Sequence, residues 1–264
     1  MQVIKTTIDL DAACARLSSA DYVTVDTEFL RESTYWPKLC LIQMAGPDEG
    51  AEYIVDPLAP DIDLAPFFKL MANANVIKVF HAARQDVEII WHLADLIPAP
   101  MFDTQLAAMV CGFGESVSYV NLVRHVTGVS LDKGARFTDW SKRPLSAKQL
   151  DYAMADVTHL REVYVHLRDE ISAAGRESWL AEEMAVLGNP GTYQTQPEDA
   201  WRRMKARVKN RRAMAILMEL AAWRERLAHD MDKPRGRILK DDTLYDIANQ
   251  QPGDSKSLGA LRSV

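Results

Sequence analysis

Two carboxylates, Asp26 and Glu28, end a β-rich segment that begins at Tyr22. Side chains two residues apart in a strand point to the same side, so this pair can share one cation. An Asp-x-Glu pair also arises by chance at solvated strand ends. The pair therefore needs further ligands nearby before it defines a site.

Two later segments supply such ligands. Asp86 opens a helix that follows a buried strand, which puts it near the carboxyl end of that strand, where sites in α/β sheets form. Tyr152 and Asp156 are four residues apart on a later helix and share one face. Taken alone, Asp86 can be an acid that favours the helix dipole, and the Tyr-Asp pair can be packing plus a surface charge.

The conjunction of these five side chains predicts a specific chemistry. Hydrolysis of a phosphodiester with two metals needs two divalent ions about 3.5–4 Å apart, held by hard oxygen ligands. One ion lowers the pKa of the attacking water, and the other stabilises the leaving oxygen. A phenol beside the water can orient it or help to remove its proton. The four carboxylates are therefore predicted to hold two Mg²⁺ or Mn²⁺ ions, with Tyr152 beside the water.

The hydrophobic pattern predicts an α/β fold that can position these residues. We expect short strands over residues 22–26, 39–44, 52–55, 76–80 and 101–103, and helices over 61–74, 84–96, 104–110 and 117–126. A loop over 128–144 should lead to a long helix that ends near Ala174, because Ser146 and Gln149 form a capping box. The sum is a mixed sheet flanked by helices.

The charge distribution separates the C-terminal part from the rest. The formal net charge is −6, but residues 201–264 carry 15 Lys/Arg against 8 Asp/Glu, whereas residues 1–200 carry 16 against 29. Such asymmetry is a hint of nucleic-acid binding. We expect a catalytic domain over residues 1–190, a basic linker over 191–207 and a small all-helical domain over 208–264.

Three segments carry a resemblance to a known family. VDTEFLRESTYWPKLCLIQ, FHAARQDVEIIWHL and GARFTDWSKRPLSAKQLDYAMADVTHL look like the three exonuclease motifs of ribonuclease D, in the DEDDy branch of the DEDD exonucleases. The DEDDh branch would carry histidine where this chain has Asp151. The resemblance implies a ribonuclease H-like fold and stepwise 3′→5′ release of 5′-mononucleotides from RNA. It also implies that Asp26, Glu28, Asp86 and Asp156 are the metal ligands and that Tyr152 is the motif-three tyrosine.

Residues around this predicted site are candidates for substrate binding. They are Thr27, Phe29, Gln43, His81, Arg136 and Arg143. Phe29 can stack on the terminal base or belong to the core. His81 and Gln43 end strands near the site, although each can be a satisfied polar residue. Arg136 and Arg143, with Lys142, can meet the RNA backbone or lie in a solvated loop. Asp103 is expected to be a helix N-cap or to support the site, not to be a fifth ligand.

The segment from residue 208 onward resembles the opening helices of an HRDC domain, a helical module that binds nucleic acid. Seven Arg/Lys and no acid lie between Trp201 and Arg212, which suits contacts with phosphates. The chain ends at Val264, before such a module is normally complete. The segment is therefore expected to be an incomplete HRDC-like domain.

The expected partner is the single-stranded 3′ end of RNA, including transfer-RNA precursors and small structured RNAs. One alternative is a 3′→5′ DNA exonuclease, because the carboxylates act on phosphate and water and not on the sugar. Another is a catalytically silent RNA-binding module. No membrane span or secretory signal is evident, so a cytoplasmic monomer is expected. Three cysteines without CxxC spacing indicate neither a disulfide framework nor a zinc site.

Overall fold

The structure is a computed structural model that describes residues 3–132, 134, 138–194, 196–205 and 208–261. The chain divides into two compact units: unit 1 comprises residues 1–30 and 38–193, and unit 2 comprises residues 31–37 and 194–264. Among the described residues, no helix has the length and apolar character needed to cross a membrane.

Unit 1 is built on a six-stranded mixed sheet with the order β1-β4-β3-β2-β5-β6. The strands are β1 (Val3–Ile4), β2 (Tyr22–Leu30), β3 (Lys38–Ala45), β4 (Glu52–Val55), β5 (Ile77–Phe80) and β6 (Met101–Asp103). The strands β2, β3 and β4 form an antiparallel meander, and β5 and β6 continue the sheet in parallel with β2. The predicted mixed sheet is confirmed.

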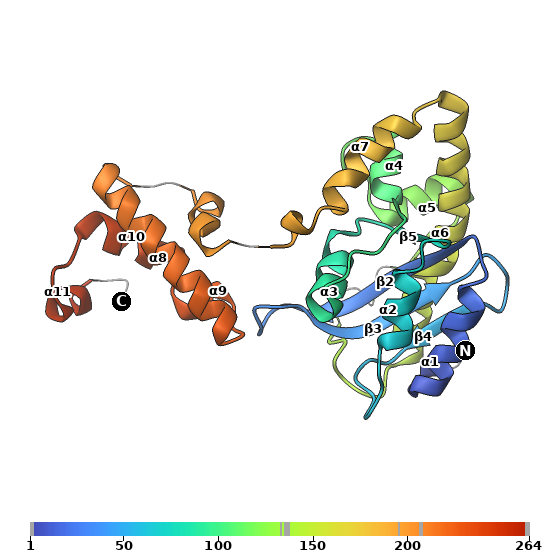
Figure 1. The fold of residues 1–264 in the computed structure, drawn as a ribbon, viewed down its shortest axis with the longest axis horizontal. Helices are drawn as coiled ribbons and strands as arrows, with labels where there is room; N and C mark the ends of the chain where they lie inside the picture. The colour runs from blue at the N-terminus through green and yellow to red at the C-terminus, as the bar shows by residue number, and fades with distance from the viewer. Residues whose placement is uncertain (1–2, 133, 135–137, 195, 206–207, 262–264) are drawn as a thin grey trace. The chain divides into compact units, whose positions relative to one another are not determined.

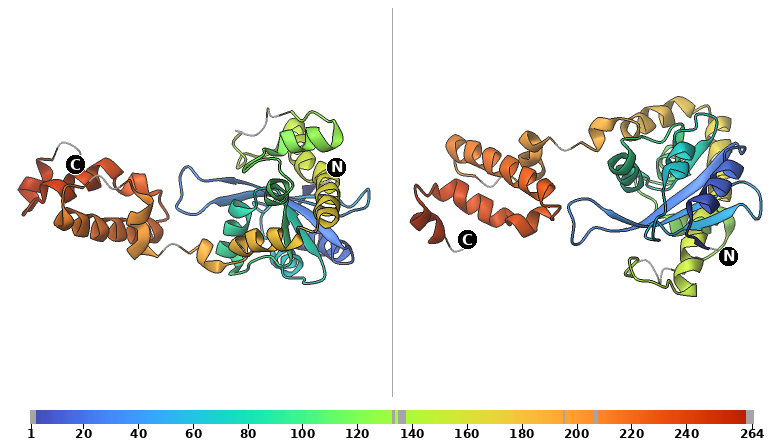
Figure 2. Two further views of the ribbon diagram at one scale, coloured as in Figure 1. Left: turned by 90° about the horizontal axis from the view of Figure 1, so that it is seen from above. Right: turned by 60° about the horizontal axis from the view of Figure 1, so that its bottom comes forward.

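Helices cover both faces of this sheet, as Figures 1 and 2 show. They are α1 (Thr7–Leu17), α2 (Ala65–Met71), α3 (Arg84–Ala94), α4 (Thr104–Val110), α5 (Tyr119–Thr127), α6 (Ala147–Ala174) and α7 (Glu177–Leu187). The apolar faces of α1, α2 and α3 share one core with Val23 and Val25 of β2, whereas Tyr22 packs in a second core with α4, α5 and α6. Alternate residues of β2 thus serve opposite faces of the sheet.

The long helix α6 begins and ends as its sequence predicts. The Ser146 side chain accepts from the Gln149 amide, and the Gln149 side chain accepts from the Ser146 amide, so the predicted capping box is confirmed. The helix ends at Gly175, whose φ of +65° suits a residue without a side chain. This helix carries Tyr152 and Asp156 across the face of β2 and β3.

Some elements differ from the sequence prediction. The first strand and helix, β1 and α1, and the late helix α7 were not predicted. The helix predicted over 61–74 is shorter, because Asp61 has a positive φ and Pro66 fits the first turn of a helix that starts at Ala65. Cys14 and Cys40 are free thiols buried in the core, as their apolar surroundings suggest.

A buried lysine on β5 offers a test of this fold. Lys78 is fully buried, and its Nζ donates to the carbonyls of Asn73, Val76 and Ala99 at 2.7, 2.8 and 2.5 Å. Lys78→Met should destabilise the protein by about 3 kcal/mol, because hydrogen bonds from a charged donor are lost and acceptors are left unpaired. Denaturant titration checks this, with Lys69→Met on the exposed side of α2 as the control. An equal midpoint for the two variants would contradict the prediction.

Unit 2 is helical. Its elements are η2 (Pro197–Arg203), α8 (Arg211–Asp230), α9 (Arg235–Ile238), α10 (Asp241–Gln250) and α11 (Ser255–Gly259), while η1 (Pro190–Thr192) belongs to unit 1. Leu217 of α8 packs on Leu244 and Ala248 of α10. The prediction of a linker over 191–207 is wrong in part, because η2 forms within it, buries Ala200 and packs on α8.

The segment 31–37, which joins β2 to β3, also belongs to unit 2. The Tyr35 hydroxyl donates to Glu225 at 2.5 Å, and Arg235 lies over the Tyr35 ring at 4.6 Å. Asp232 accepts from the Tyr35 amide at 3.0 Å. This segment is therefore an integral part of the packing of unit 2.

Candidate active site

Three carboxylates from two elements converge on one side of the sheet of unit 1. Asp26 and Glu28 lie on β2 and Asp156 lies on α6, and one oxygen from each carboxylate falls within 4.8 Å of the others. All three are partly buried. The strand spacing and the placement of α6 thus bring together residues that lie about half the chain length apart in sequence.

Asp86 is the most buried of the four carboxylates. It lies in the first turn of α3 with 6% of its surface exposed, and the hydroxyl of Thr27 donates to its Oδ1. Burial raises the pKa of Asp86 to about 7, with a further contribution from the charge of Asp103, although the Thr27 hydrogen bond opposes the shift. In the absence of a cation, the carboxyl is therefore partly protonated near neutral pH.

The pKa of Asp26 reflects the charges of all the other carboxylates in the cluster. Burial raises the pKa of Asp26 well above its usual value, and the charges of Asp86, Asp156 and Glu28 raise it further. Like charges held this close repel one another unless a cation lies between them. Carboxylate oxygens are hard ligands of the type that Mg²⁺ and Mn²⁺ prefer. The donor set and its repulsion therefore fit a divalent metal ion.

Tyr152 lies one helical turn before Asp156, close enough for the carboxylate of Asp156 to act on its hydroxyl. Burial raises the pKa of Tyr152, and the charges of Asp156, Glu28 and Asp26 raise it further. The phenol therefore keeps its proton at neutral pH. Of the two roles considered for this residue, a protonated hydroxyl suits orientation of a water molecule better than removal of its proton.

Sequence reasoning missed a second tyrosine beside the cluster. Tyr119 of α5 donates its hydroxyl to the carbonyl of Ala155 at 2.9 Å. Burial raises the pKa of Tyr119, as do the nearby charges of Asp156 and Asp26. A tyrosine at the start of a short helix carries no sequence signal for this position, because the contact depends on how α5 packs on α6.

Asp103 caps a helix, as one of its two predicted roles requires. Its carboxylate accepts from the amides of Gln105 and Leu106 at the start of α4, and also from the amides of Ala82 and Ala83 just before α3. Ala82 has a φ of +59°, which is rare outside glycine. Asp103 thus holds the turn that presents Asp86.

Asp103→Ala should therefore destabilise the protein by about 3 kcal/mol, because a buried acceptor of four amides is lost. Asp103→Asn should lower the stability less, since one side-chain oxygen remains to accept hydrogen bonds from the amides. Thermal unfolding of the two variants checks this order. Equal stability of Asp103→Ala and the wild type would contradict it.

Two substrate-binding candidates lie buried next to the carboxylates. Thr27 uses its hydroxyl to hold Asp86, and Gln43 is fully buried opposite Asp26 in the β2–β3 register. Neither side chain is accessible to a substrate, so the structure corrects both predictions. The side-chain amide of Gln43 has no hydrogen-bond partner among the described residues.

Phe29 and His81 lie at the same edge with different surroundings. Phe29 follows the β-bulge after Glu28 and packs partly against the core, which agrees with the core position that was one of its two predicted roles. His81 has its Nδ1 2.9 Å from the Thr104 hydroxyl, and burial lowers its pKa. Substrate contact by either residue stays a prediction.

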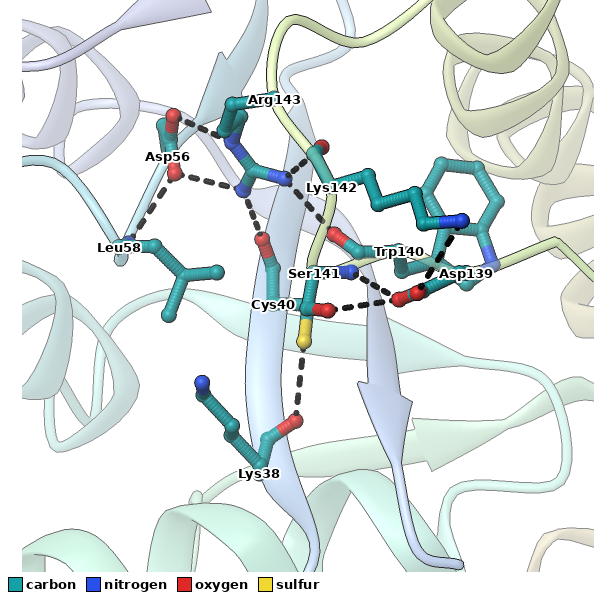
Figure 3. A network of polar contacts seen from close by, with 9 residues as sticks. All are labelled: Lys38, Cys40, Asp56, Leu58, Asp139, Trp140, Ser141, Lys142 and Arg143. Carbon is teal, nitrogen blue, oxygen red and sulfur yellow. Dashed lines mark hydrogen bonds and ion pairs between the residues drawn. The ribbon is translucent and has the colours of Figure 1, made fainter.

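Arg143 does not have the surroundings of a phosphate ligand. Its guanidinium pairs with both oxygens of Asp56 at 2.7 and 2.6 Å and donates to the carbonyls of Cys40, Trp140 and Lys142 (Figure 3). These partners use its N–H groups within the protein, so the structure corrects the predicted RNA contact. The other loop candidate, Arg136, lies outside the described residues.

Comparisons with known proteins agree with this geometry. The family model of a 3'-5' exonuclease matches residues 1–172, and that of an HRDC domain matches residues 213–264. The fold and the carboxylate cluster thus belong to a 3′→5′ exonuclease of the type that uses divalent metal ions.

Full-length similarity defines the family. The chain is 54% identical to ribonuclease D of Nitrobacter hamburgensis, in an alignment that covers 100% of this chain and 69% of that protein. It is 52% identical to ribonuclease D of Bartonella henselae, in an alignment that covers 100% of this chain and 64% of that protein. The crystal structure of Escherichia coli RNase D superimposes with a TM-score of 0.89 at 31% identity, over all of this chain and 70% of that one. The chain belongs to the ribonuclease D family and spans about two thirds of the length of these relatives.

Proposed function

We propose that this chain is a 3′→5′ exoribonuclease that releases 5′-mononucleotides from RNA 3′ ends by two-metal hydrolysis. The observation that carries the proposal is the convergence of Asp26, Glu28 and Asp156, with Tyr152 one helical turn before Asp156 on α6. Escherichia coli RNase D, an exoribonuclease involved in structured RNA processing, supports RNA as the substrate. We extend this to transfer-RNA precursors and small structured RNAs.

The proposed cofactors are two divalent ions, Mg²⁺ or Mn²⁺, held by Asp26, Glu28, Asp86 and Asp156. When bound, such ions lower the pKa of a water molecule and stabilise charge on the leaving oxygen. The carboxylates supply the hard oxygen ligands and balance the charge. Thr27 fixes the rotamer of Asp86 through its hydrogen bond, and Asp103 holds the turn before α3.

The reaction places distinct demands on Tyr152. Water attacks the terminal phosphodiester at phosphorus, the bond to the 3′ oxygen of the preceding nucleotide breaks, and a 5′-mononucleotide and a new 3′ hydroxyl form. Because Tyr152 keeps its proton, its hydroxyl can hydrogen-bond to the attacking water and set its direction.

The test is an assay with matched substrates. A 5′-labelled single-stranded RNA, a DNA of the same sequence and a 3′-extended transfer-RNA precursor are incubated with Mg²⁺, Mn²⁺ or EDTA. The expected result is a ladder that shortens from the RNA 3′ end with metal and disappears with EDTA. Preferential shortening of DNA would replace the proposal with a DNA exonuclease, and binding of RNA without shortening would replace it with a silent RNA-binding module.

A further inference from the structure

The loop of residues 138–146 leads into α6, the helix that carries Tyr152 and Asp156. The described loop residues form no helix or strand, so the start of α6 depends on side-chain anchors. Asp139 provides one, since its carboxylate accepts from the amide and hydroxyl of Ser141 at 3.0 and 2.6 Å. That anchor is local and exposed, and it does not tie the loop to the sheet.

Arg143 ties the loop to the sheet. Its guanidinium pairs with Asp56, which follows β4, and donates to the carbonyl of Cys40 on β3 at 2.7 Å. Asp56 is only 3% exposed, and hydrogen bonds from Arg143 and the Leu58 amide lower its pKa although burial opposes the shift. Figure 3 shows the guanidinium between the loop and these strands. Breaking one partner of such a buried pair leaves the other charge uncompensated.

The same guanidinium fixes Trp140. Its Nη1 donates to the Trp140 carbonyl at 2.7 Å, and the indole is 2% exposed in a cluster with Leu41, Ile54 and Ala153. The indole Nε1 has no hydrogen-bond partner among the described residues, so packing and the backbone hold this ring. The Trp140 and Tyr152 ring centroids are 6.1 Å apart. A shift of the loop would therefore change the surface on which Tyr152 rests.

We propose that the Asp56–Arg143 pair is a positioning device that seats Trp140 against Tyr152 and thereby sets the direction of the Tyr152 hydroxyl. The inference rests on the proposed function for its catalytic consequence. Arg143 and Asp56 touch no reacting atom; they act through Trp140. If Arg143 contacted a phosphate, its substitution would weaken RNA binding. If Arg143 positions Trp140, its substitution slows the reaction and leaves RNA binding unchanged.

The variants Arg143→Lys and Asp56→Asn test the proposal. Lysine keeps the charge but cannot reach both oxygens of Asp56 and the carbonyls of Cys40, Trp140 and Lys142 at once. We expect kcat to fall 10- to 100-fold, roughly the range that one positioned catalytic group supplies, with KM for RNA changed by less than about threefold. The control is Lys148→Met. Lys148 lies in the first turn of α6 and pairs with the exposed Asp132, and loss of this ion pair should leave kcat unchanged.

A double-mutant cycle with Tyr152→Phe separates positioning from general damage. If Arg143 acts through Tyr152, Arg143→Lys should lower kcat by less than about threefold when the phenol hydroxyl is already absent. Equal losses in both backgrounds would overturn the proposal, as would a rise in KM at constant kcat. Asp56→Asn provides the same cycle if Arg143→Lys does not fold.

Hydrogen exchange of the Trp140 indole N–H gives a readout independent of activity. The resonance is assigned by its loss in Trp140→Phe, and exchange should be at least about tenfold faster in Arg143→Lys and Asp56→Asn than in Lys148→Met. Unchanged exchange in both variants would overturn the proposal. If the wild type fails to shorten RNA, the proposed function fails, while the exchange data still decide whether the pair positions Trp140.

Discussion

Asp26→Asn is expected to abolish release of nucleotides from RNA 3′ ends. The charges of Asp86, Asp156 and Glu28 all raise the pKa of Asp26, so its carboxylate interacts with each of the other three. Asparagine keeps the shape but removes a negative charge that two cations would share. Because a bound metal supplies several kcal/mol of transition-state stabilisation and about 1.4 kcal/mol corresponds to tenfold in rate, the loss should be at least about a thousandfold.

The measurement pairs nucleotide release with Mn²⁺ titration by calorimetry. The variant should bind Mn²⁺ more weakly and retain binding of RNA that is measured in EDTA. Asp21→Asn, just before β2 and exposed, is the matched control and should behave as the wild type. Full activity of Asp26→Asn with Mg²⁺ would remove Asp26 from the site and would contradict the two-metal mechanism.

The sequence predicts the architecture wherever a local signal exists. The capping box at Ser146 and Gln149 and the apolar periodicity fixed the bounds of α6 almost to the residue. The two-residue spacing of Asp26 and Glu28 predicted that both face the same side, and the structure brings their carboxylates together with that of Asp156. Each of these features depends on residues near one another in the chain or on one repeated pattern.

Contacts between distant segments left no such signal. Arg143 and Asp56 are 87 residues apart, and an arginine in a charged loop resembles a phosphate ligand as much as a structural anchor. Thr27 and Asp86 are 59 residues apart, so the hydrogen bond that occupies the threonine was not predictable. The strand predicted over 22–26 continues to Leu30 as β2, and the burial of Thr27 and Gln43 follows from the packing of helices on both faces.

The metal-free protein should lose stability as pH rises from about 4 to 7, and Asp86→Asn should remove part of this loss. The pKa of Asp86 is raised from 3.8 to about 7 in the folded state. A carboxyl whose folded pKa is raised has no cost below its unfolded pKa, and it destabilises the fold increasingly until the pH passes the folded pKa. At about 1.4 kcal/mol per pH unit, the cost above pH 7 reaches up to about 4 kcal/mol.

Thermal unfolding in EDTA between pH 4 and 8, with and without Mg²⁺ or Mn²⁺, checks this linkage. Asp86→Asn should melt at a higher temperature than the wild type above pH 7 in EDTA, and at the same temperature near pH 4. Metal should raise the melting temperature of the wild type more than that of the variant, because ligands that bind only the folded state stabilise it. Asp151→Asn, exposed on α6, controls for the loss of one charge. If the wild type and Asp86→Asn melt at the same temperature in EDTA at pH 8, burial does not raise the pKa of Asp86, and the linkage argued here fails.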